Sequence, residues 1–167
     1  AAAKAAKTQQ HLQILSTFST SSVEEVAAAR GEPVWYQLYP TPRWEITQSL
    51  LQRAESVASP VVVLTVDLPT GSNRETEQRL RRMDSRDCSA CHSAGLDGYL
   101  ERKPMFKGLN IAGLGGTLLP EMTWDFVERL KNETDMKVVL KGIVTHEDAH
   151  LCVDYGVDGI IVSNHGG

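Results

Sequence analysis

The chain alternates short apolar runs with longer amphipathic stretches, and this alternation constrains its fold more than any other feature. Short apolar runs bounded by turn residues predict buried strands, whereas an apolar period of 3.6 residues predicts helices. The predicted strands cover residues 11–16, 34–39, 60–67, 137–141 and 158–163. The predicted helices cover residues 22–29, 43–57, 123–132 and 145–156, and residues 1–7 are typical of the end of a further helix. Consecutive strand–helix units of this kind require right-handed crossovers, so the sequence predicts an α/β fold with a parallel sheet.

The helix at residues 22–29 begins with a capping-box pattern that two pairs of residues can form. Either Ser21 with Glu24 or Ser22 with Glu25 places a hydroxyl three residues before a carboxylate. Each side chain of such a pair accepts a hydrogen bond from the backbone of the other residue. Thr123 is placed to cap a later helix through its hydroxyl. These signals support the predicted order of strands and helices.

Two architectures fit consecutive strand–helix units, a closed (β/α)8 barrel and an open doubly wound sheet. No Gly-x-Gly-x-x-Gly turn follows the first predicted strand, which counts against the dinucleotide-binding form of the open sheet. A barrel needs eight strands and about 250 residues, whereas this chain has 167 residues. We therefore expect residues 1–167 to form one domain, the central fragment of a TIM (β/α)8 barrel, with a long inserted loop at about residues 68–122.

Composition argues against two classes of function. The net charge is −4 and no basic stripe alternates with aromatic residues, so we expect no nucleic-acid partner. No apolar stretch approaches the roughly 20 residues that a membrane-spanning helix needs. The first residues lack the pattern of a signal peptide. The compartment stays unknown at this point, with the cytoplasm favoured.

Polar side chains follow several of the predicted strands at the point where each strand ends. The last apolar run leads into Ser163, Asn164 and His165, and earlier runs lead into Asp67 and Lys141. Parallel strands end at the same edge of a sheet, or the same mouth of a barrel, where α/β enzymes carry their sites. The sequence therefore predicts an active site to which several distant segments contribute.

Four segments at these strand ends carry a resemblance to a known family. They are Trp-Tyr-Gln-Leu-Tyr at residues 35–39, Thr-Val-Asp at 65–67, Leu-Lys-Gly-Ile at 140–143 and Ile-Val-Ser-Asn-His-Gly-Gly at 161–167. In this order they resemble the FMN-dependent α-hydroxy acid oxidases and dehydrogenases, a family that includes glycolate oxidase, lactate oxidase, mandelate dehydrogenase and the flavocytochrome lactate dehydrogenases. The resemblance covers most of the chain except about residues 75–120. It implies an FMN-binding barrel of which about strands 2 to 6 are present.

The resemblance implies an FMN site built from residues at successive strand ends. The residues that match flavin-contacting positions are Ser16, Gln37, Thr65, Lys141 and Ser163. Lys141 has an electronic role in this picture, because a fixed cation beside the flavin raises its electron affinity.

The resemblance also implies which residues act on the substrate. His165 matches the catalytic base, Asp67 the carboxylate that orients this base, and Tyr39 the tyrosine that hydrogen-bonds the substrate oxygen. Arg74 matches an arginine near the substrate carboxylate, and Phe18 matches a residue that lines the substrate pocket. An imidazole suits proton removal because its ordinary pKa is near neutrality, and a guanidinium fork suits a planar carboxylate.

The implied reaction is the oxidation of a small 2-hydroxy acid to the 2-oxo acid, with electrons passing to FMN and then to oxygen or another acceptor. We expect the fragment alone to be inactive and the full-length protein to be a homo-oligomer. Two alternatives stay open. One is another flavin- or phosphate-binding barrel, such as a type 2 isopentenyl diphosphate isomerase, and the other is an inactive truncated barrel.

The inserted segment contains Cys88, Cys91 and His92 at the spacing used for covalent attachment of haem c. A haem there would take electrons from the flavin, but no neighbouring segment has the pattern of a haem pocket. Zinc would need a fourth ligand. We therefore expect reduced thiols or a disulfide in this segment, and no metal.

Overall fold

In the computed structural model, five strands form one parallel sheet whose order follows the chain, β1-β2-β3-β4-β5. The structure describes residues 1–68, 73–86, 95–116, 119 and 121–166. The strands are β1 (Ile14–Ser16), β2 (Trp35–Leu38), β3 (Val61–Thr65), β4 (Lys137–Ile143) and β5 (Gly159–Val162). Each lies within or close to a strand predicted from the apolar runs. A sequential parallel order is the arrangement of consecutive strands in a (β/α)8 barrel.

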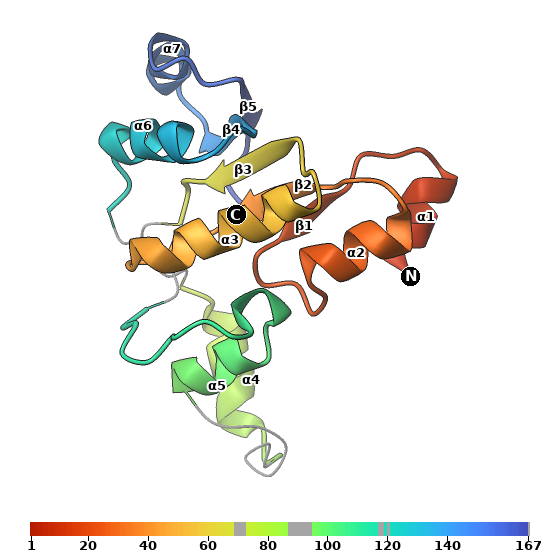
Figure 1. Cartoon of the computed structure of the whole chain (residues 1–167). Helices are drawn as coiled ribbons and strands as arrows, with labels where there is room; N and C mark the ends of the chain where they lie inside the picture. Colours follow the sequence, from red (N-terminus) through yellow and green to blue (C-terminus); the bar gives the residue numbers. More distant parts are fainter. Residues whose placement is uncertain (69–72, 87–94, 117–118, 120, 167) are drawn as a thin grey trace.

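The helices that connect the strands cover one face of this sheet (Figure 1). They are α2 (Val23–Arg30), α3 (Trp44–Ser56), α6 (Trp124–Glu133) and α7 (His146–Asp154), with α1 (Ala2–Thr8) preceding the first strand. Among the residues that the structure describes, no helix is long and apolar enough to cross a membrane.

The two faces of the sheet bury different sets of side chains. The face toward the helices contributes Tyr36, Leu64 and Leu140 to the main core, all almost completely buried. The opposite face contributes Val63 and Val139 to a smaller cluster. Each fully buried side chain of this size stabilises the fold by about 1.5–3 kcal/mol. Burial on both faces explains why the strands read as nearly continuous apolar runs.

The start of α2 shows which of the two possible capping boxes forms. The Ser22 hydroxyl accepts a hydrogen bond from the Glu25 backbone N–H at 3.2 Å, and the Glu25 carboxylate accepts one from the Ser22 N–H at 2.8 Å. Thr123 accepts from the backbone of Phe126, as predicted for the start of α6. These caps satisfy N–H groups that a helix leaves unpaired at its first turn.

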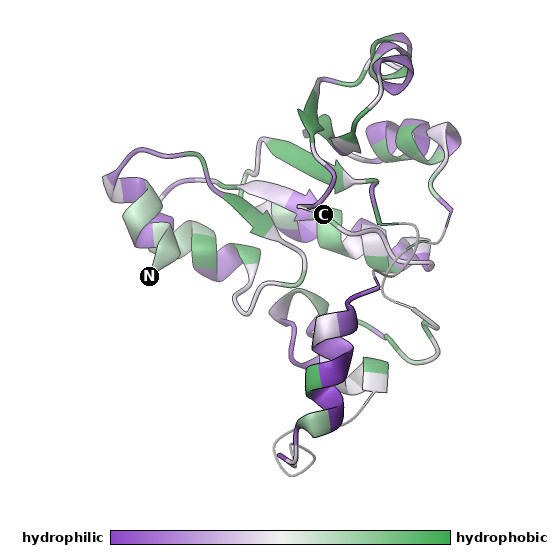
Figure 2. Cartoon of the chain, turned by 180° about the vertical axis from the view of Figure 1, so that it is seen from behind, coloured by the Kyte–Doolittle hydropathy of each residue, from purple (hydrophilic) through white to green (hydrophobic). Residues whose placement is uncertain are grey.

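In the described parts of the segment at residues 68–122, three helical elements are present that the sequence pattern did not predict. They are α4 (Glu75–Met83), α5 (Gly95–Glu101) and the 3₁₀ turn η1 (Pro104–Phe106). Helix α4 buries none of its residues and is mostly hydrophilic (Figure 2), so it carries no apolar face that a period could reveal. Met105 and Phe106 of η1, in contrast, are buried in the main core. The segment is therefore partly packed rather than a plain loop.

Arg53 fastens η1 to the helical layer. Its guanidinium donates to both carboxylate oxygens of Glu24 on α2, at 2.7 and 2.8 Å. It also donates to the backbone oxygens of Pro104 and Met105, at 2.8 and 2.7 Å. The hydrogen bond from Arg53 lowers the pKa of Glu24 from its ordinary 4.5 to about 2. One guanidinium thus links α2, α3 and the inserted segment.

The substitution Glu24→Gln should lower stability in a pH-dependent way. Because the folded-state pKa of Glu24 is depressed, its contribution is present above pH 4.5 and is lost as the pH falls toward about 2. The carboxylate is partly exposed, so we expect a loss of no more than about 1 kcal/mol near neutral pH. Denaturant unfolding at several pH values measures this difference. The exposed Glu128→Gln on α6 is the control, and an equal loss at all pH values for Glu24→Gln would contradict the assignment.

Candidate active site

The predicted cofactor residues lie along one face of the sheet near the strand ends. Ser16 is the register partner of Gln37, and Thr65 is the register partner of Lys141. Register partners on adjacent strands point to the same face of a sheet. The buried Gln37 side chain donates from Nε2 to Thr65 Oγ1 at 2.9 Å. Polar groups from four strands therefore share one surface, on the face away from the helices.

His165 lies between Asp67 and Tyr39, which come from distant parts of the chain. Its Nδ1 is 2.8 Å from Asp67 Oδ1, and its Nε2 is 3.3 Å from the Tyr39 hydroxyl. A carboxylate only accepts hydrogen bonds, so the contact with Asp67 assigns the proton to Nδ1. Nε2 then keeps its lone pair and accepts from Tyr39. The structure thus brings together the three residues predicted to be catalytic.

Lys141 adds a cation to this cluster. Its Nζ lies 3.6 Å from Asp67 Oδ2 and 3.3 Å from His165 Nδ1. With the proton on Nδ1, both nitrogen atoms are donors, so the carboxylate is the group that attracts the ammonium. The side chains of Asp67 and Lys141 are only 10% and 24% exposed, which limits screening of their charges by water. The Asp67 carboxylate therefore accepts a hydrogen bond from His165 and forms an ion pair with Lys141 at the same time.

The phenol of Tyr39 is held in its protonated form. Burial raises the pKa of Tyr39, and the negative charge of the Asp67 carboxylate raises it further. Near neutral pH the hydroxyl is therefore a hydrogen-bond donor. It can donate to His165 Nε2 or to an oxygen of a bound molecule.

Gly142 makes room for Asp67. The register of β4 against β5 shifts between Lys141 and Ile143, and Gly142 at this irregularity has φ +117°. A Cβ atom placed on Gly142 would lie 2.6 Å from Asp67 Cβ. Sequence reasoning missed this role, although a glycine directly after a strand-end lysine was the available signal.

Two of the hydroxyls predicted to contact FMN bind the local backbone here. Ser163 Oγ accepts from the His165 N–H at 3.1 Å and so holds the turn that carries the imidazole. His165 itself has φ +64°, an uncommon conformation for a residue with a side chain. Ser16 Oγ accepts from the Phe18 N–H at 3.2 Å. Flavin contact for Ser16 and Ser163 remains a prediction.

Phe18 belongs to an aromatic cluster at the edge of the site. Its ring stacks on Tyr39, with centroids 5.1 Å apart, and on Phe106, at 5.9 Å. Tyr99 of α5 packs against it at 5.8 Å, and Lys103 Nζ donates to the Phe18 backbone oxygen at 2.7 Å. Tyr99 and Lys103 were not predicted, because the inserted segment gave no periodic signal. Phe18 is thus both a core residue and a neighbour of Tyr39.

Arg74 lies directly before α4, with a side chain that is 72% exposed and 3.6 Å from Glu77 Oε2. This ion pair does not place it against the imidazole, so its role with a substrate carboxylate remains a prediction. Cys88, Cys91 and His92 lie outside the described residues. Within the described ranges, no group of three or more His, Cys, Asp and Glu side chains is arranged to hold a metal ion.

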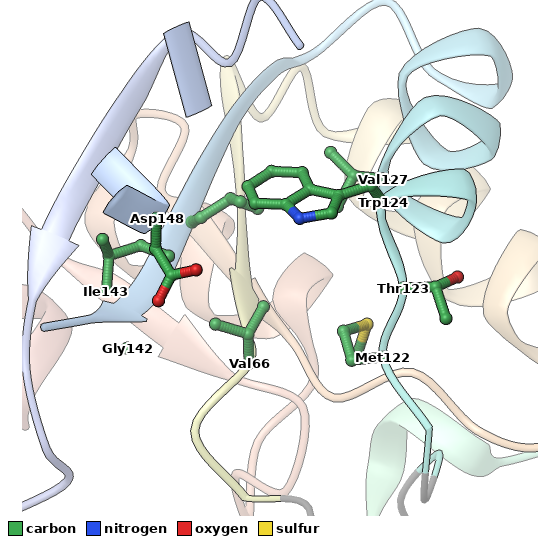
Figure 3. Close-up of a pocket in the computed structure, with 9 residues that line it drawn as sticks. Val66, Met122, Thr123, Trp124, Val127, Gly142, Ile143 and Asp148 are labelled. Atoms are coloured by element: carbon green, nitrogen blue, oxygen red, sulfur yellow. The ribbon is translucent and has the colours of Figure 1, made fainter. Parts of the chain in front are cut away.

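A separate pocket of about 220 Å³ lies on the helix-facing side of the sheet, between the ends of β3 and β4 and helices α6 and α7 (Figure 3). Its walls include the apolar residues Val66, Trp124 and Leu140, together with the polar residues Thr123 and Asp148. None of the predicted site residues is among its described lining residues. The strand-end cluster and this pocket are therefore on opposite faces of the sheet.

Comparisons with known proteins agree with this arrangement. All of residues 1–167 match the sequence model of a family described as FMN-dependent dehydrogenase. A 2-hydroxyacid oxidase of Dictyostelium discoideum is 35% identical over 173 residues, which cover 98% of this chain and 41% of the relative. An L-lactate dehydrogenase (cytochrome) of Wickerhamomyces anomalus is 31% identical over 169 residues, which cover 100% of this chain and 28% of the relative.

A crystal structure of mandelate oxidase matches with a TM-score of 0.74 and 33% sequence identity, over 99% of this chain and 43% of that chain. The chain spans less than half the length of the relatives named here. Together with the sequential parallel sheet, these matches confirm the predicted fold class, a part of a (β/α)8 barrel.

The substitution Gly142→Ala should displace Asp67 and destabilise the protein. The matched control is Gly108→Ala, because Gly108 also has a positive φ but has nothing within 4 Å of an added Cβ. We expect the control to cost about 1 kcal/mol for backbone strain and Gly142→Ala to cost about 1–3 kcal/mol more for the clash. Denaturant unfolding measures both values. Equal costs at the two positions would show that the contact with Asp67 is unimportant.

Proposed function

Since the chain belongs to the FMN-dependent dehydrogenase family, we propose that it supplies the catalytic base and the flavin-facing residues for the oxidation of a small 2-hydroxy acid to the 2-oxo acid. The observation that carries the proposal is the position of the His165 imidazole between Asp67 and Tyr39. The chain spans less than half the length of its relatives, so the proposal concerns the residues that this chain contributes to the reaction.

The polar residues on the face of the sheet away from the helices fit a flavin. A flavin ring presents hydrogen-bond donors and acceptors along one edge, and Gln37, Thr65 and Lys141 offer matching polar groups side by side. When bound, FMN supplies the acceptor for the two electrons that leave the substrate. Lys141 would place a positive charge beside it, which stabilises the additional negative charge of the reduced form.

His165 would take the proton that leaves the substrate. With Nδ1–H donating to Asp67, Nε2 keeps a lone pair, which accepts from the Tyr39 hydroxyl here and would accept the proton of a bound substrate. The imidazolium that results is stabilised by the Asp67 carboxylate at 2.8 Å. Tyr39, whose pKa burial raises further above neutrality, would donate a hydrogen bond to the substrate oxygen.

The substrate class follows from the chemistry of the site and the names of the relatives. The relatives named above are an oxidase of 2-hydroxy acids, a lactate dehydrogenase and a mandelate oxidase, and none of them is an isomerase. We propose Phe18 as part of the wall for the substrate side chain and Arg74 as a partner of its carboxylate. Oxygen or another electron acceptor would reoxidise the flavin, and homo-oligomeric assembly of the full-length protein remains a prediction.

Anaerobic mixing of the full-length, FMN-loaded protein with glycolate, L-lactate and mandelate tests the proposal. Bleaching of the visible flavin absorbance by at least one of these acids is the expected result. Silence across the panel, with FMN bound, would count against 2-hydroxy acid oxidation and in favour of a different flavin reaction.

The substitution His165→Ala should lower turnover by about 10²- to 10⁴-fold, the usual contribution of a general base, while FMN stays bound. The reason is that Nε2 acts on the substrate and not on the cofactor. Steady-state kinetics and the flavin spectrum measure the two effects separately. His150→Ala, at an exposed position on α7, is the control, and unchanged turnover in His165→Ala would show that another group is the base.

The substitution Lys141→Met should make bound FMN harder to reduce, because it removes the positive charge next to the flavin. The expected result is a lower midpoint potential together with slower flavin reduction by substrate. Lys137→Met, at the opposite end of the same strand and 72% exposed, should leave the potential unchanged. A potential unaffected by Lys141→Met would place the ammonium away from the flavin.

A further inference from the structure

Thr17 follows β1 directly and is completely buried. Its hydroxyl donates to the backbone oxygen of Gln37 at 2.7 Å and accepts from the backbone N–H of Tyr39 at 3.0 Å. The Tyr36 hydroxyl lies 3.1 Å from Thr17 Oγ1. Because the proton of Thr17 goes to Gln37, Tyr36 is the donor in this third contact. One hydroxyl thus contacts three residues of β2 and its continuation.

These contacts extend the sheet beyond the end of its strands. The Thr17 N–H also donates to the Gln37 oxygen, at 3.0 Å, and this is the last backbone bond between β1 and β2. Tyr39, directly after β2, has the next backbone N–H that faces β1. This N–H donates to the Thr17 hydroxyl and not to a backbone oxygen. The side chain therefore fixes the backbone of Tyr39 one step past the regular ladder.

Residues 17 and 18 together fix both ends of Tyr39. Thr17 holds its backbone N–H, and the adjacent Phe18 stacks on its ring with centroids 5.1 Å apart. The Tyr39 hydroxyl then reaches 3.3 Å from His165 Nε2. The distance from phenol to imidazole depends on where this backbone lies, since the ring has few rotatable bonds.

We propose that Thr17 is a positioning residue that sets the Tyr39 hydroxyl against His165. The inference rests on the proposed function, because it takes Tyr39 and His165 as the groups that act on the substrate. Thr17 itself acts through the backbone of Tyr39. The competing explanation is that Thr17 only stabilises the fold by satisfying the buried Tyr36 hydroxyl, whose pKa burial raises.

Three substitutions separate the two explanations. Thr17→Val keeps the shape of the side chain but removes the acceptor for Tyr39, and Thr17→Ser restores a hydroxyl. Thr47→Val is the matched control, because Thr47 is also fully buried and its hydroxyl also accepts from a backbone N–H, that of Thr41. All are made in the full-length, FMN-loaded protein and are compared in unfolding temperature and in turnover of a 2-hydroxy acid.

We expect Thr17→Val to lower kcat by about tenfold, as small misplacements of catalytic groups do, with FMN affinity retained. Thr17→Ser should keep kcat within about twofold of the original protein. Thr47→Val should lose stability without losing kcat. Loss of kcat in Thr47→Val to the same degree as in Thr17→Val would overturn the inference, because destabilisation alone would then explain both.

A double-mutant cycle with Tyr39→Phe gives the decisive result. If Thr17 acts through the Tyr39 hydroxyl, Thr17→Val should have little further effect on kcat once that hydroxyl is gone. An equal, multiplicative loss in both backgrounds would overturn the inference. If Thr17→Val does not fold, Thr17→Ala replaces it in the cycle. A loss of kcat only in the presence of the Tyr39 hydroxyl would support the inference, and an equal loss in both backgrounds would overturn it.

The cycle also distinguishes failure of this inference from failure of the proposed function. If Tyr39→Phe slows turnover but neither Thr17→Val nor Thr17→Ala does, only the role of Thr17 is wrong. If Tyr39→Phe itself leaves turnover unchanged, Tyr39 has no part in the reaction, and the role of Thr17 fails with it.

Discussion

The hydrogen bond between His165 Nδ1 and Asp67 Oδ1, at 2.8 Å, is the interaction on which the rest of the site depends. It assigns the ring proton to Nδ1 and leaves a lone pair on Nε2, the atom that faces the Tyr39 hydroxyl and can accept a proton. It also joins residues 98 positions apart in the chain, so it exists only if β3 and β5 end at the same edge of the sheet. The same carboxylate attracts Lys141, and it fits beside β4 only because Gly142 has no side chain.

Burial of apolar side chains holds the strands in one sheet, and this brings His165, Asp67 and Lys141 together. Apolar side chains on both faces of the strands hold the sheet together, which leaves the strand ends free to carry polar groups. A parallel sheet brings all its carboxyl ends to one edge, so short polar sequences after each strand meet without long loops. Ser163 and Thr17 then fix the backbone beside two of these ends. The apolar strand residues stabilise the fold, and the polar residues in the last positions of the strands and directly after them carry the candidate chemistry.

Much of this could be predicted from the sequence, because the governing signals are local. The apolar runs gave all five strands, and the Ser22–Glu25 pair explains the start of α2. The grouping of His165 with Asp67, Tyr39 and Lys141 followed from the resemblance. Helix α4 could not be predicted, since a helix without a buried apolar face has no period. Helix α5 buries Leu100 in the core, but its seven residues are too few to show a helical period. The packing of Tyr99 and Lys103 on Phe18 depends on that segment and was missed for the same reason.

A crystal structure of the protein with FMN and a 2-hydroxy acid bound would test the central claim most directly. The result expected is a flavin ring against Gln37, Thr65 and Lys141, with the substrate hydroxyl within hydrogen-bond distance of His165 Nε2 and Tyr39. An imidazole turned away from Asp67, or a substrate bound at the helix-facing side of the sheet, would contradict it.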